Sequence, residues 1–284
     1  MNVPKVVGVV GGGRMGAGIA QVFAVAGAYV TIAEADESAA AAALQRVEHG
    51  LEQAAAKGRL TCRPADVLGR VQTVTSVSAL PPEASLVVEA VPEIVEAKLA
   101  VLTAVEGVVG PEVVIASNTS SLSIGDLGSA LEQPTRFLGM HFFNPVPAST
   151  LVEVVRAPET SGSVIKTVLG WVEALGKTDI LVKDSPGFAT SRLGVSLGLE
   201  AIRMLEEGVA DAESIDRAME LGYRHPMGPL RSTDLVGLDV RLAIAEYLHT
   251  TLGERFCPPQ LLRDKVSRGE LGRKSGQGFY DWRQ

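Results

Sequence analysis

The stretch KVVGVVGGGRMGAGIAQVFAVAGAYVTIAEAD, residues 5–36, decides how this chain folds. Residues 6–10 are mostly valine, which is typical of a β-strand buried on both faces. A glycine-rich turn follows, and the alanine-rich segment 17–26 has the apolar pattern of a helix. Residues 29–33 then have the pattern of a second strand, with Glu34 at its end. The order predicts a strand, a turn, a helix and another strand of a parallel sheet.

Three glycines of the turn have the spacing G-x-G-x-x-G, and each has a steric reason. Gly11 permits a tight turn from strand to helix, Gly13 leaves room for a pyrophosphate, and Gly16 lets the helix pack closely on the strand. The first N–H groups of the helix are unpaired and attract phosphate. Met15 lies in the same turn and is a further candidate for contact with a bound dinucleotide.

Glu34 indicates which dinucleotide is bound. It follows Gly16 by 18 residues, at the end of the second strand, where a carboxylate accepts hydrogen bonds from ribose hydroxyls. The same carboxylate repels a 2′-phosphate, so the predicted cofactor is NAD rather than NADP. A glycine-rich turn alone is a common link between a strand and a helix. Here the strand, the glycines, the helix, the second strand and the acid occur in the order of a dinucleotide-binding motif, which favours that interpretation.

The composition is that of an ordinary globular protein. At 284 residues the chain is long for one domain, and its hydrophobic content of 46% is ample for a core. A net charge of −7 argues against a nucleic-acid partner. Cys62 and Cys257 fit no metal-binding spacing, so we expect no bound metal. Two cysteines also make a disulfide framework unexpected, so we expect reduced thiols in a protein of the cytoplasm. We find no signal peptide and no long apolar run, and therefore expect no membrane partner.

Strands and helices alternate through the first half of the chain. The patterns predict strands at 71–77, 86–90 and 113–116 and helices at 38–57, from Pro64, at 93–106 and at 124–131. This alternation is typical of a doubly wound α/β sheet, which binds ligands at the carboxyl ends of its strands. Glu89, Glu93 and residues 117–121 stand at such ends and are candidates for a site, although serines there also cap helices, as Ser123 is expected to do.

Lys57, Arg59 and Arg63 form a small basic group at the end of the helix 38–57. Such a group is either a solvated helix end or an anion site. If the group is an anion site, Lys57 is a candidate for binding the substrate.

His141 and Glu153 are the candidates for acid–base chemistry. Residues 136–142 predict a strand that ends near His141, and residues 151–155 predict another strand with Glu153 among aliphatic side chains. An isolated buried carboxylate is costly, so Glu153 needs a partner, and the loop between the strands allows it to face His141. A carboxylate that orients an imidazole makes a general base. A purely structural pair that joins the two strands is the alternative.

The sequence KDSPG, residues 183–187, marks a domain boundary after one more strand at 178–182. Beyond it the pattern is helical, at 188–207, 212–221, 227–252 and 258–268, and the first of these helices is apolar enough for a bundle or a dimer contact. We therefore predict an NAD-binding α/β domain over 1–185 and an all-α domain over 186–284.

These residues together resemble the L-3-hydroxyacyl-CoA dehydrogenases, in particular the short bacterial 3-hydroxybutyryl-CoA dehydrogenases. The resemblance covers the whole chain, and its markers are VVGGGRMGAGIAQ, VVEAVPE with Lys98, ASNTSSLSI, GMHFFNPVP with LVEVV, DSPGF, HPMGPL with DLVGLDV, and GRKSGQGFYDW. It implies a Rossmann-type NAD-binding domain, an acyl-CoA substrate, a role in fatty acid metabolism and a homodimer formed through the helical domain.

The resemblance also assigns roles to the site residues. His141 would be the catalytic base, Glu153 its orienting partner, and Ser120 would hydrogen-bond the 3-oxygen of the substrate. On the side of the nicotinamide the family places four positions, which are Asn144, Glu93, Lys98 and either Ser117 or Asn118.

Two positions depart from the family pattern and bear on the substrate. Ser191 stands where the family has an asparagine that reaches the substrate carbonyl. The serine side chain is shorter and lacks the second hydrogen-bonding group of the amide. Ser149 and Thr150 stand where the family often has methionine and lysine, which removes a positive charge. These changes leave two alternatives open. One is the same chemistry on a hydroxyacyl group, such as a glyceryl unit, carried by an acyl-carrier protein in polyketide extender synthesis, and the other is a catalytically silent NAD-binding relative.

Overall fold

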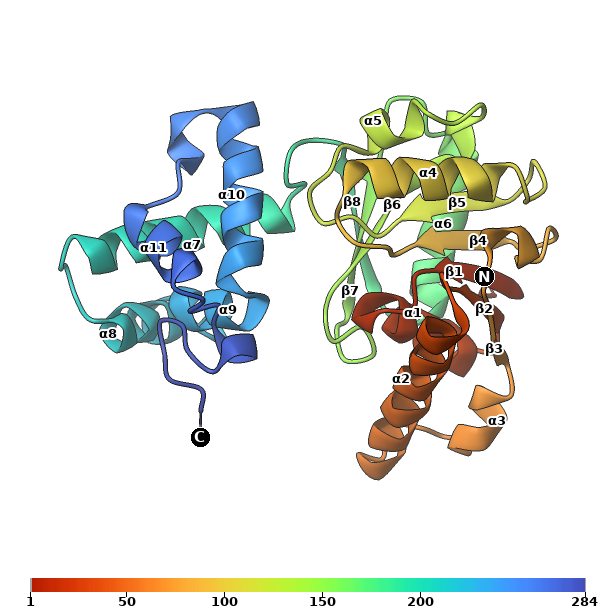
Figure 1. Ribbon diagram of the computed structural model, residues 1–284, viewed down its shortest axis with the longest axis horizontal. Coiled ribbons are helices and arrows are strands. Elements are labelled where there is room, and N and C mark those ends of the chain that lie inside the picture. Colours follow the sequence, from red (N-terminus) through yellow and green to blue (C-terminus); the bar gives the residue numbers. More distant parts are fainter. Residues whose placement is uncertain (1, 284) are drawn as a thin grey trace. The chain divides into compact units, whose positions relative to one another are not determined.

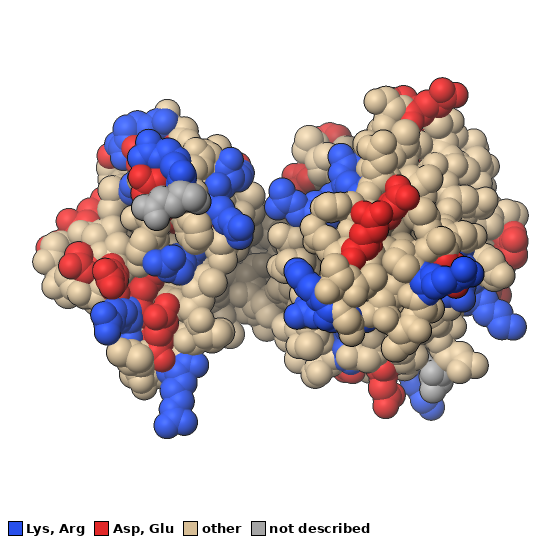
Figure 2. Space-filling view, turned by 90° about the horizontal axis from the view of Figure 1, so that it is seen from below, with Lys and Arg blue, Asp and Glu red and all other residues tan. Residues whose placement is uncertain are grey.

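The computed structural model describes residues 2–283, and the chain divides into two compact units, Met1–Ser185 and Pro186–Gln284. The first unit contains a sheet with helices packed against it, and the second is built from helices (Figure 1). Among the described residues, none of the helices combines the length and the apolar character needed to span a membrane. On the face of each unit that Figure 2 shows, acidic and basic side chains are interspersed.

Eight strands form one sheet in the order β3-β2-β1-β4-β5-β6-β7-β8. Neighbouring strands run parallel except β6 and β7, which are antiparallel. The strands are β1 (Val6–Val10), β2 (Tyr29–Ala33), β3 (Val71–Val74), β4 (Leu86–Glu89), β5 (Val114–Ser117), β6 (Phe137–Phe142), β7 (Leu151–Arg156) and β8 (Thr178–Lys183).

The helices of the first unit alternate with these strands, as a doubly wound sheet requires. They are α1 (Arg14–Val25), α2 (Glu37–Ala56), α3 (Pro64–Leu68), α4 (Val95–Glu106), α5 (Ile124–Gly128) and α6 (Gly162–Ala174), with short 3₁₀ turns at Val77–Ala79 and Pro134–Arg136. Asp36 caps α2 by accepting the N–H of Ala39, and Ser123 caps α5 by accepting the N–H of Asp126. The predicted fold class, a doubly wound Rossmann-type sheet followed by a helical part, is confirmed.

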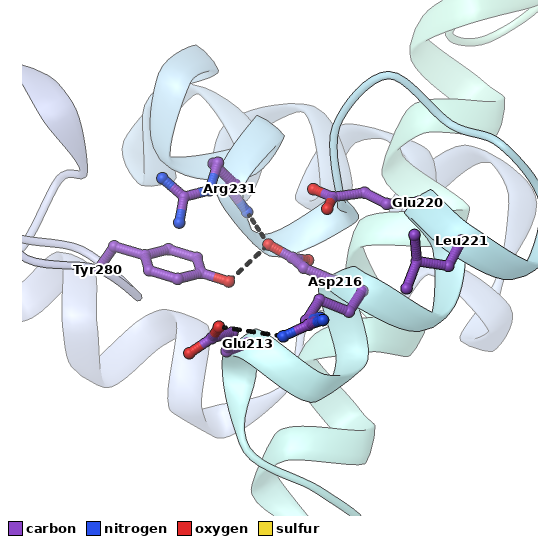
Figure 3. A pocket seen from close by; sticks show the side chains of 7 residues that line it. Glu213, Asp216, Glu220, Leu221, Arg231 and Tyr280 are labelled. Atoms are coloured by element: carbon purple, nitrogen blue, oxygen red, sulfur yellow. Dashed lines mark hydrogen bonds and ion pairs between the residues drawn. The ribbon is translucent and has the colours of Figure 1, made fainter.

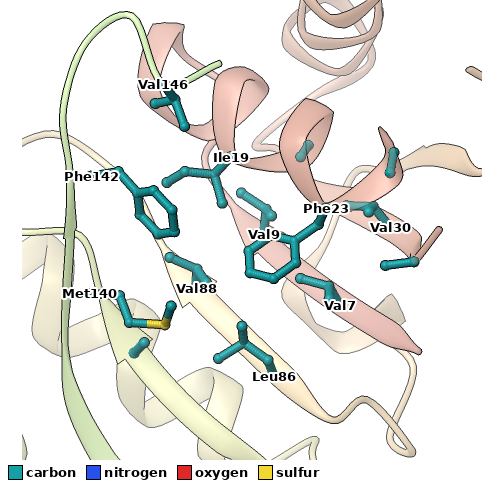
Figure 4. Packing of buried hydrophobic residues seen from close by; sticks show 14 of the residues in the cluster. Val7, Val9, Ile19, Phe23, Val30, Leu86, Val88, Met140, Phe142 and Val146 are labelled. Carbon is teal, nitrogen blue, oxygen red and sulfur yellow. The ribbon is translucent and has the colours of Figure 1, made fainter. Parts of the chain in front are cut away.

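The core of the first unit lies between the central strands and α1. Figure 4 shows Ile19 and Phe23 of α1 among the valines of β1 and the apolar side chains of β4 and β6. The rings of Phe23 and Phe142 meet edge to face, with centroids 6.4 Å apart. Because β1 is buried on both faces of the sheet, its apolar run has no polar alternation.

Strand β3, helix α4 and helix α6 differ from the sequence prediction. Strand β3 ends at Val74 because Ser76 starts a 3₁₀ turn, its hydroxyl accepting the N–H of Ser78. Helix α4 begins at Val95 rather than at residue 93, so Glu93 lies in the loop before it. Helix α6 has no counterpart among the predicted elements, although Ser161 caps it.

The second unit packs its helices around a separate core. They are α7 (Thr190–Glu206), α8 (Ala212–Arg217), a π-helical turn (Ala218–Gly222), α9 (Pro229–Val236), α10 (Leu238–Leu252) and α11 (Gln260–Ser267), with 3₁₀ turns at Glu254–Phe256 and Arg273–Ser275. The single helix predicted over 227–252 is two helices, because Gly237 has a φ of 104° and ends α9. On α7, Val195, Leu199 and Ile202 are buried, whereas Leu193 is 71% exposed.

Asp216 joins three parts of the second unit. Its carboxylate accepts the N–H groups of Leu230 and Arg231 at the start of α9, both at 2.8 Å, and the hydroxyl of Tyr280 at 2.7 Å. Figure 3 shows Tyr280 and Arg231 beside Asp216 at the edge of a hollow of about 350 Å³. Burial and the hydrogen bond to Asp216 raise the pKa of Tyr280 well above its ordinary value, so its hydroxyl remains a donor.

Candidate active site

The glycine turn between β1 and α1 has the steric features that its sequence predicts. Gly11 has a φ of 91°, and a Cβ on Gly16 would lie 1.8 Å from the carbonyl oxygen of Gly11. In contrast, a Cβ on Gly13 would meet no atom within 4 Å. Gly13 is the N-cap of α1 and provides no side-chain acceptor, so no cap side chain competes with a pyrophosphate for the first-turn N–H groups. Met15 is half-buried and packs on the core beside this turn.

Glu34 lies directly against the same turn. One of its carboxylate oxygens, Oε1, accepts the N–H of Gly12 at 2.6 Å. Arg46 of α2 donates to the carbonyl oxygen of Gly12 at 3.1 Å from the other side. Gly12 and Arg46 are absent from the sequence-based candidates, because their contacts depend on how α2 packs. A side chain at Gly12 would collide with Ala43, which explains the middle glycine of the GGG run.

His141 and Glu153 are opposite each other in the register of β6 and β7. Nδ1 of His141 is 2.9 Å from Oε2 of Glu153, and both side chains are buried. The two side chains therefore make the contact that the sequence predicts, and their role in catalysis stays a prediction. Because Nδ1 is bonded to the carboxylate, Nε2 is the ring nitrogen suited to exchange a proton with a substrate. The ring of Phe143 lies against the imidazole, with centroids 4.3 Å apart.

The loop that follows β5 is organised around Glu93. Oε1 of Glu93 accepts the hydroxyl of Thr119 at 2.6 Å, the N–H of Ser120 at 2.9 Å and the hydroxyl of Ser120 at 3.2 Å. Oε2 of Glu93 forms an ion pair with Lys98 at 3.3 Å. Desolvation opposes ionisation of Glu93, but the Lys98 ammonium and the hydrogen bonds outweigh it and hold the pKa of Glu93 below its usual value. Two predicted site residues, Glu93 and Ser120, are thus in direct contact.

A buried charged pair lies under this loop. Nζ of Lys98 is 2.7 Å from Oε1 of Glu89, and each side chain is only 1% exposed. Ser117 donates its hydroxyl to the other oxygen of Glu89 at 2.5 Å. The carboxylate of Glu89 therefore links the end of β4, the end of β5 and helix α4. The sequence places Glu89 at a strand end, but the contact with Lys98, nine residues later, requires the three-dimensional structure.

Asn118 connects this loop to the strand that carries His141. Its Oδ1 accepts the N–H of Phe142 at 2.9 Å. The strands β4 to β7 are neighbours in the sheet. The residues on them, in the loops that follow β4 and β5 or on α4 therefore form one group, which comprises Glu93, Lys98, Asn118, Ser120, His141 and Glu153.

Asn144 is exposed in the loop between β6 and β7. Lys177 holds that loop, because its ammonium donates to the carbonyl oxygens of Val146 at 2.8 Å and Ser149 at 2.5 Å. Burial lowers the pKa of Lys177. Lys177 is a residue that the sequence analysis missed, since a lysine between a helix and a strand carries no distinctive signal.

Two predicted substrate contacts, Lys57 and Ser191, belong to other elements of the chain. Lys57 is exposed where α2 ends, and α2 packs beside β2, β3 and α3, toward the opposite edge of the sheet from β7. Ser191 is in the first turn of α7 and belongs to the second unit. Their roles toward a substrate stay predictions.

A dinucleotide turn with an acid at its second strand, on the same sheet as a buried histidine–carboxylate pair, defines a class of protein, the NAD-dependent oxidoreductases. Family models narrow the class. The NAD-binding domain of 3-hydroxyacyl-CoA dehydrogenase matches residues 6–185, and the C-terminal domain of 3-hydroxyacyl-CoA dehydrogenase matches residues 187–282. The chain belongs to the 3-hydroxyacyl-CoA dehydrogenase family. The predicted family, enzyme class and cofactor are confirmed.

Individual relatives agree over nearly the full length. The chain is 43% identical over 276 residues to a probable 3-hydroxybutyryl-CoA dehydrogenase of Deinococcus radiodurans, covering 97% of this chain and 99% of that one. Among solved structures, FadB2 of Mycobacterium tuberculosis superposes with a TM-score of 0.95 at 41% identity, with 99% of both chains covered. The (S)-3-hydroxybutyryl-CoA dehydrogenase PaaH1 of Ralstonia eutropha superposes with a TM-score of 0.93 at 40% identity, and the match covers 98% of this chain and 99% of that chain. These relatives give no support to the alternative of a substrate on a carrier protein.

Proposed function

We propose that this protein interconverts a short 3-hydroxyacyl-CoA and the corresponding 3-oxoacyl-CoA, with 3-hydroxybutyryl-CoA as the type of substrate. The buried pair of His141 and Glu153 at the strand ends carries the proposal, because oxidation of a secondary alcohol requires a base for the hydroxyl proton. The proposal that the acyl chain is short is supported by the names of the relatives described above.

The reaction needs the following from the residues of this chain. Nε2 of His141 takes the proton of the 3-hydroxyl group during oxidation and returns it during reduction. Glu153 holds Nδ1 and stabilises the imidazolium that forms. The hydroxyl of Ser120 positions the 3-oxygen. When NAD is bound, it supplies the acceptor for the hydride that leaves C3.

The cofactor is held by the first unit in this proposal. The first turn of α1, with Gly11, Gly13, Met15 and Gly16, would receive the pyrophosphate. Glu34 retains a second carboxylate oxygen, Oε2, for the ribose hydroxyls. Glu93, Lys98, Asn118 and Asn144 would line the nicotinamide end, which places the cofactor near His141.

We further propose that residues 186–284 provide the dimer contact and part of the substrate site, that Ser191 and Lys57 contact the substrate, and that the enzyme works in the cytoplasm in fatty acid metabolism. The exposed Leu193 on α7 supports an apolar contact with a second copy. Cys62 and Cys257 are both free thiols, in keeping with a reducing compartment.

The test follows NADH absorbance with acetoacetyl-CoA for the purified protein and for His141→Gln. We expect turnover by the unmodified protein and a loss in kcat of about a hundredfold or more in the variant, with NADH affinity unchanged. Equal turnover by His141→Gln would contradict the role of the histidine. Preference of the unmodified protein for long-chain 3-oxoacyl-CoA would contradict the proposed substrate.

A further inference from the structure

Three side chains with metal-binding atoms meet in the second unit, at the end of α10. The donor atoms of His249, Glu254 and Cys257 all lie within 4.8 Å of one another in the part of the chain that the structure describes. Nε2 of His249 is 3.1 Å from Oε1 of Glu254. This group belongs to neither the dinucleotide turn nor the strand ends that carry His141, and nothing in the proposed reaction uses it.

The backbone fixes these three side chains within nine residues. Gly253, with a φ of 88°, ends α10 by donating its N–H to the carbonyl oxygen of His249 at 2.9 Å. The 3₁₀ turn Glu254–Phe256 follows at once, and the N–H of Cys257 donates to the carbonyl oxygen of Glu254 at 2.9 Å. A glycine is needed here, because only a positive φ turns the chain back so sharply.

Two anchors hold this turn against the rest of the second unit. Phe256 is 2% exposed and belongs to the helical core. Arg203 of α7 donates to the carbonyl oxygen of Cys257 at 2.9 Å. The positions of the three donor residues are therefore set by packing before any ligand arrives.

The surroundings favour a cation. Two of the three residues, Glu254 and Cys257, line a hollow of about 560 Å³ whose walls also include Glu200, Glu206 and Glu207 against Arg203 and Arg255. The carboxylates outnumber the guanidinium groups by two. The side chain of His249 is 32% exposed and that of Glu254 is 90% exposed, so a metal ion from solvent has direct access.

We propose that His249, Glu254 and Cys257 bind a zinc ion through Nε2, a carboxylate oxygen and Sγ. An imidazole, a thiolate and a carboxylate match the ligands of Zn²⁺ and not those of Mg²⁺ or Ca²⁺. Around a tetrahedral zinc ion, with Zn–N and Zn–O near 2.1 Å, nitrogen and oxygen ligands lie about 3.4 Å apart. The separation of 3.1 Å between His249 and Glu254 is close to that value. The two separations that involve Sγ of Cys257 are within 4.8 Å, and zinc binding would require rotation of the Cys257 and Glu254 side chains to shorten them to about 3.5 Å.

The proposed site has three protein ligands, so water completes the coordination. Binding converts the Cys257 thiol to a thiolate, and the thiol proton passes to the solvent. No electron transfer takes place.

The test uses the full-length protein after treatment with a chelator, without substrate or NAD, so its result does not depend on the proposed enzymatic activity. Titration with Co²⁺ should produce one equivalent of a near-ultraviolet thiolate-to-cobalt absorption band. Zn²⁺ should displace that band, whereas Mg²⁺ at the same concentration should not.

Variants decide whether these residues are the ligands. Cys257→Ser should abolish the cobalt–thiolate band, and His249→Gln and Glu254→Gln should each weaken zinc binding at least about tenfold. Cys62→Ser and His49→Gln are matched controls and should leave the band unchanged. Circular dichroism checks that each variant keeps its helical content. Zinc affinity of Cys257→Ser or of His249→Gln equal to that of the unmodified protein would overturn the proposal, as would a band that Cys62→Ser removes.

Discussion

His141 and Glu153 face each other across the one antiparallel strand pair of the eight-stranded sheet, and Nδ1 of the histidine is 2.9 Å from Oε2 of the glutamate. The strand register itself aligns the two side chains, so neither depends on a flexible loop for its position. A catalytic pair on two hydrogen-bonded strands is held more firmly than one on loops.

The first prediction concerns the carboxylate of this pair. Glu153→Gln keeps the shape of the side chain but removes the charge that stabilises an imidazolium at His141. We expect kcat to fall by about a hundredfold or more, with a smaller change in KM. Steady-state NADH assays over a pH series measure both constants, and Glu153→Asp should recover part of the lost rate. Unchanged kcat in Glu153→Gln would mean that the pair only joins the two strands.

Gly13 and Gly16 give a matched pair of glycine substitutions. An added methyl group at Gly13 meets no protein atom within 4 Å, whereas at Gly16 it would lie 1.8 Å from the carbonyl oxygen of Gly11. We expect Gly13→Ala to change the stability by less than about 0.5 kcal/mol and to raise KM for NAD at least about tenfold, because the pyrophosphate loses its space. Gly16→Ala should lower the stability by about 1–3 kcal/mol or more. Thermal melts and NAD titrations separate the two effects, and equal NAD affinity of Gly13→Ala and the unmodified protein would contradict the assigned role.

The ionisation of Glu93 makes part of the stability depend on pH. Its pKa is below the ordinary value of 4.5, because the Lys98 ammonium and the hydrogen bonds from Thr119 and Ser120 outweigh desolvation. A group with a lowered folded-state pKa stabilises the fold above its unfolded pKa, and this contribution is lost as the pH falls through the folded value. Relative to Glu93→Gln, the unmodified protein should therefore be more stable at pH 7, with the difference shrinking below about pH 4.5. Urea unfolding at several pH values measures it, and the exposed Glu112→Gln should show no such trend.

Tyr280 is expected to stabilise the second unit through Asp216. Tyr280→Phe removes the 2.7 Å hydrogen bond to a buried carboxylate, at a cost of about 1.5–3 kcal/mol. Because burial and Asp216 raise the folded-state pKa of Tyr280 above its ordinary value, this advantage should be complete below about pH 10 and decline as the pH rises from there. Thermal melts measure the loss, and Tyr223→Phe, at a tyrosine that is 75% exposed, is the control. Equal melting temperatures of Tyr280→Phe and the unmodified protein would contradict this role.

Local patterns in the sequence were sufficient for the elements that carry the two main parts of the site. The bounds of β1 and β2 follow from short apolar, β-branched runs close to glycine, and the facing positions of His141 and Glu153 follow from the cost of burying an unpaired carboxylate. Both depend on short-range rules.

Contacts between distant segments could not be predicted in the same way. The bond from Gly12 to Glu34 and the pairing of Lys98 with Glu89 depend on the packing of helices on the sheet. Gly237 stands within an otherwise continuous helical pattern, and only its positive φ distinguishes a break from a tolerated glycine. His249 and Cys257 meet because Gly253 reverses the chain, which their spacing alone does not indicate.

Ser191 is the position where substitution should change activity toward the proposed substrate most directly. The family pattern has an asparagine here, and its amide provides a donor and an acceptor where serine provides a single hydroxyl. If the serine costs one contact with the transition state, Ser191→Asn should raise kcat/KM for acetoacetyl-CoA by up to about a hundredfold. The measurement compares both forms with acetoacetyl-CoA and with a 3-oxoacyl-CoA of longer chain, with Ser196→Asn, on an exposed part of α7, as the control. A fall in activity with both substrates would instead mean that the pocket is adapted to serine, because the larger amide then occupies space that the acyl group needs.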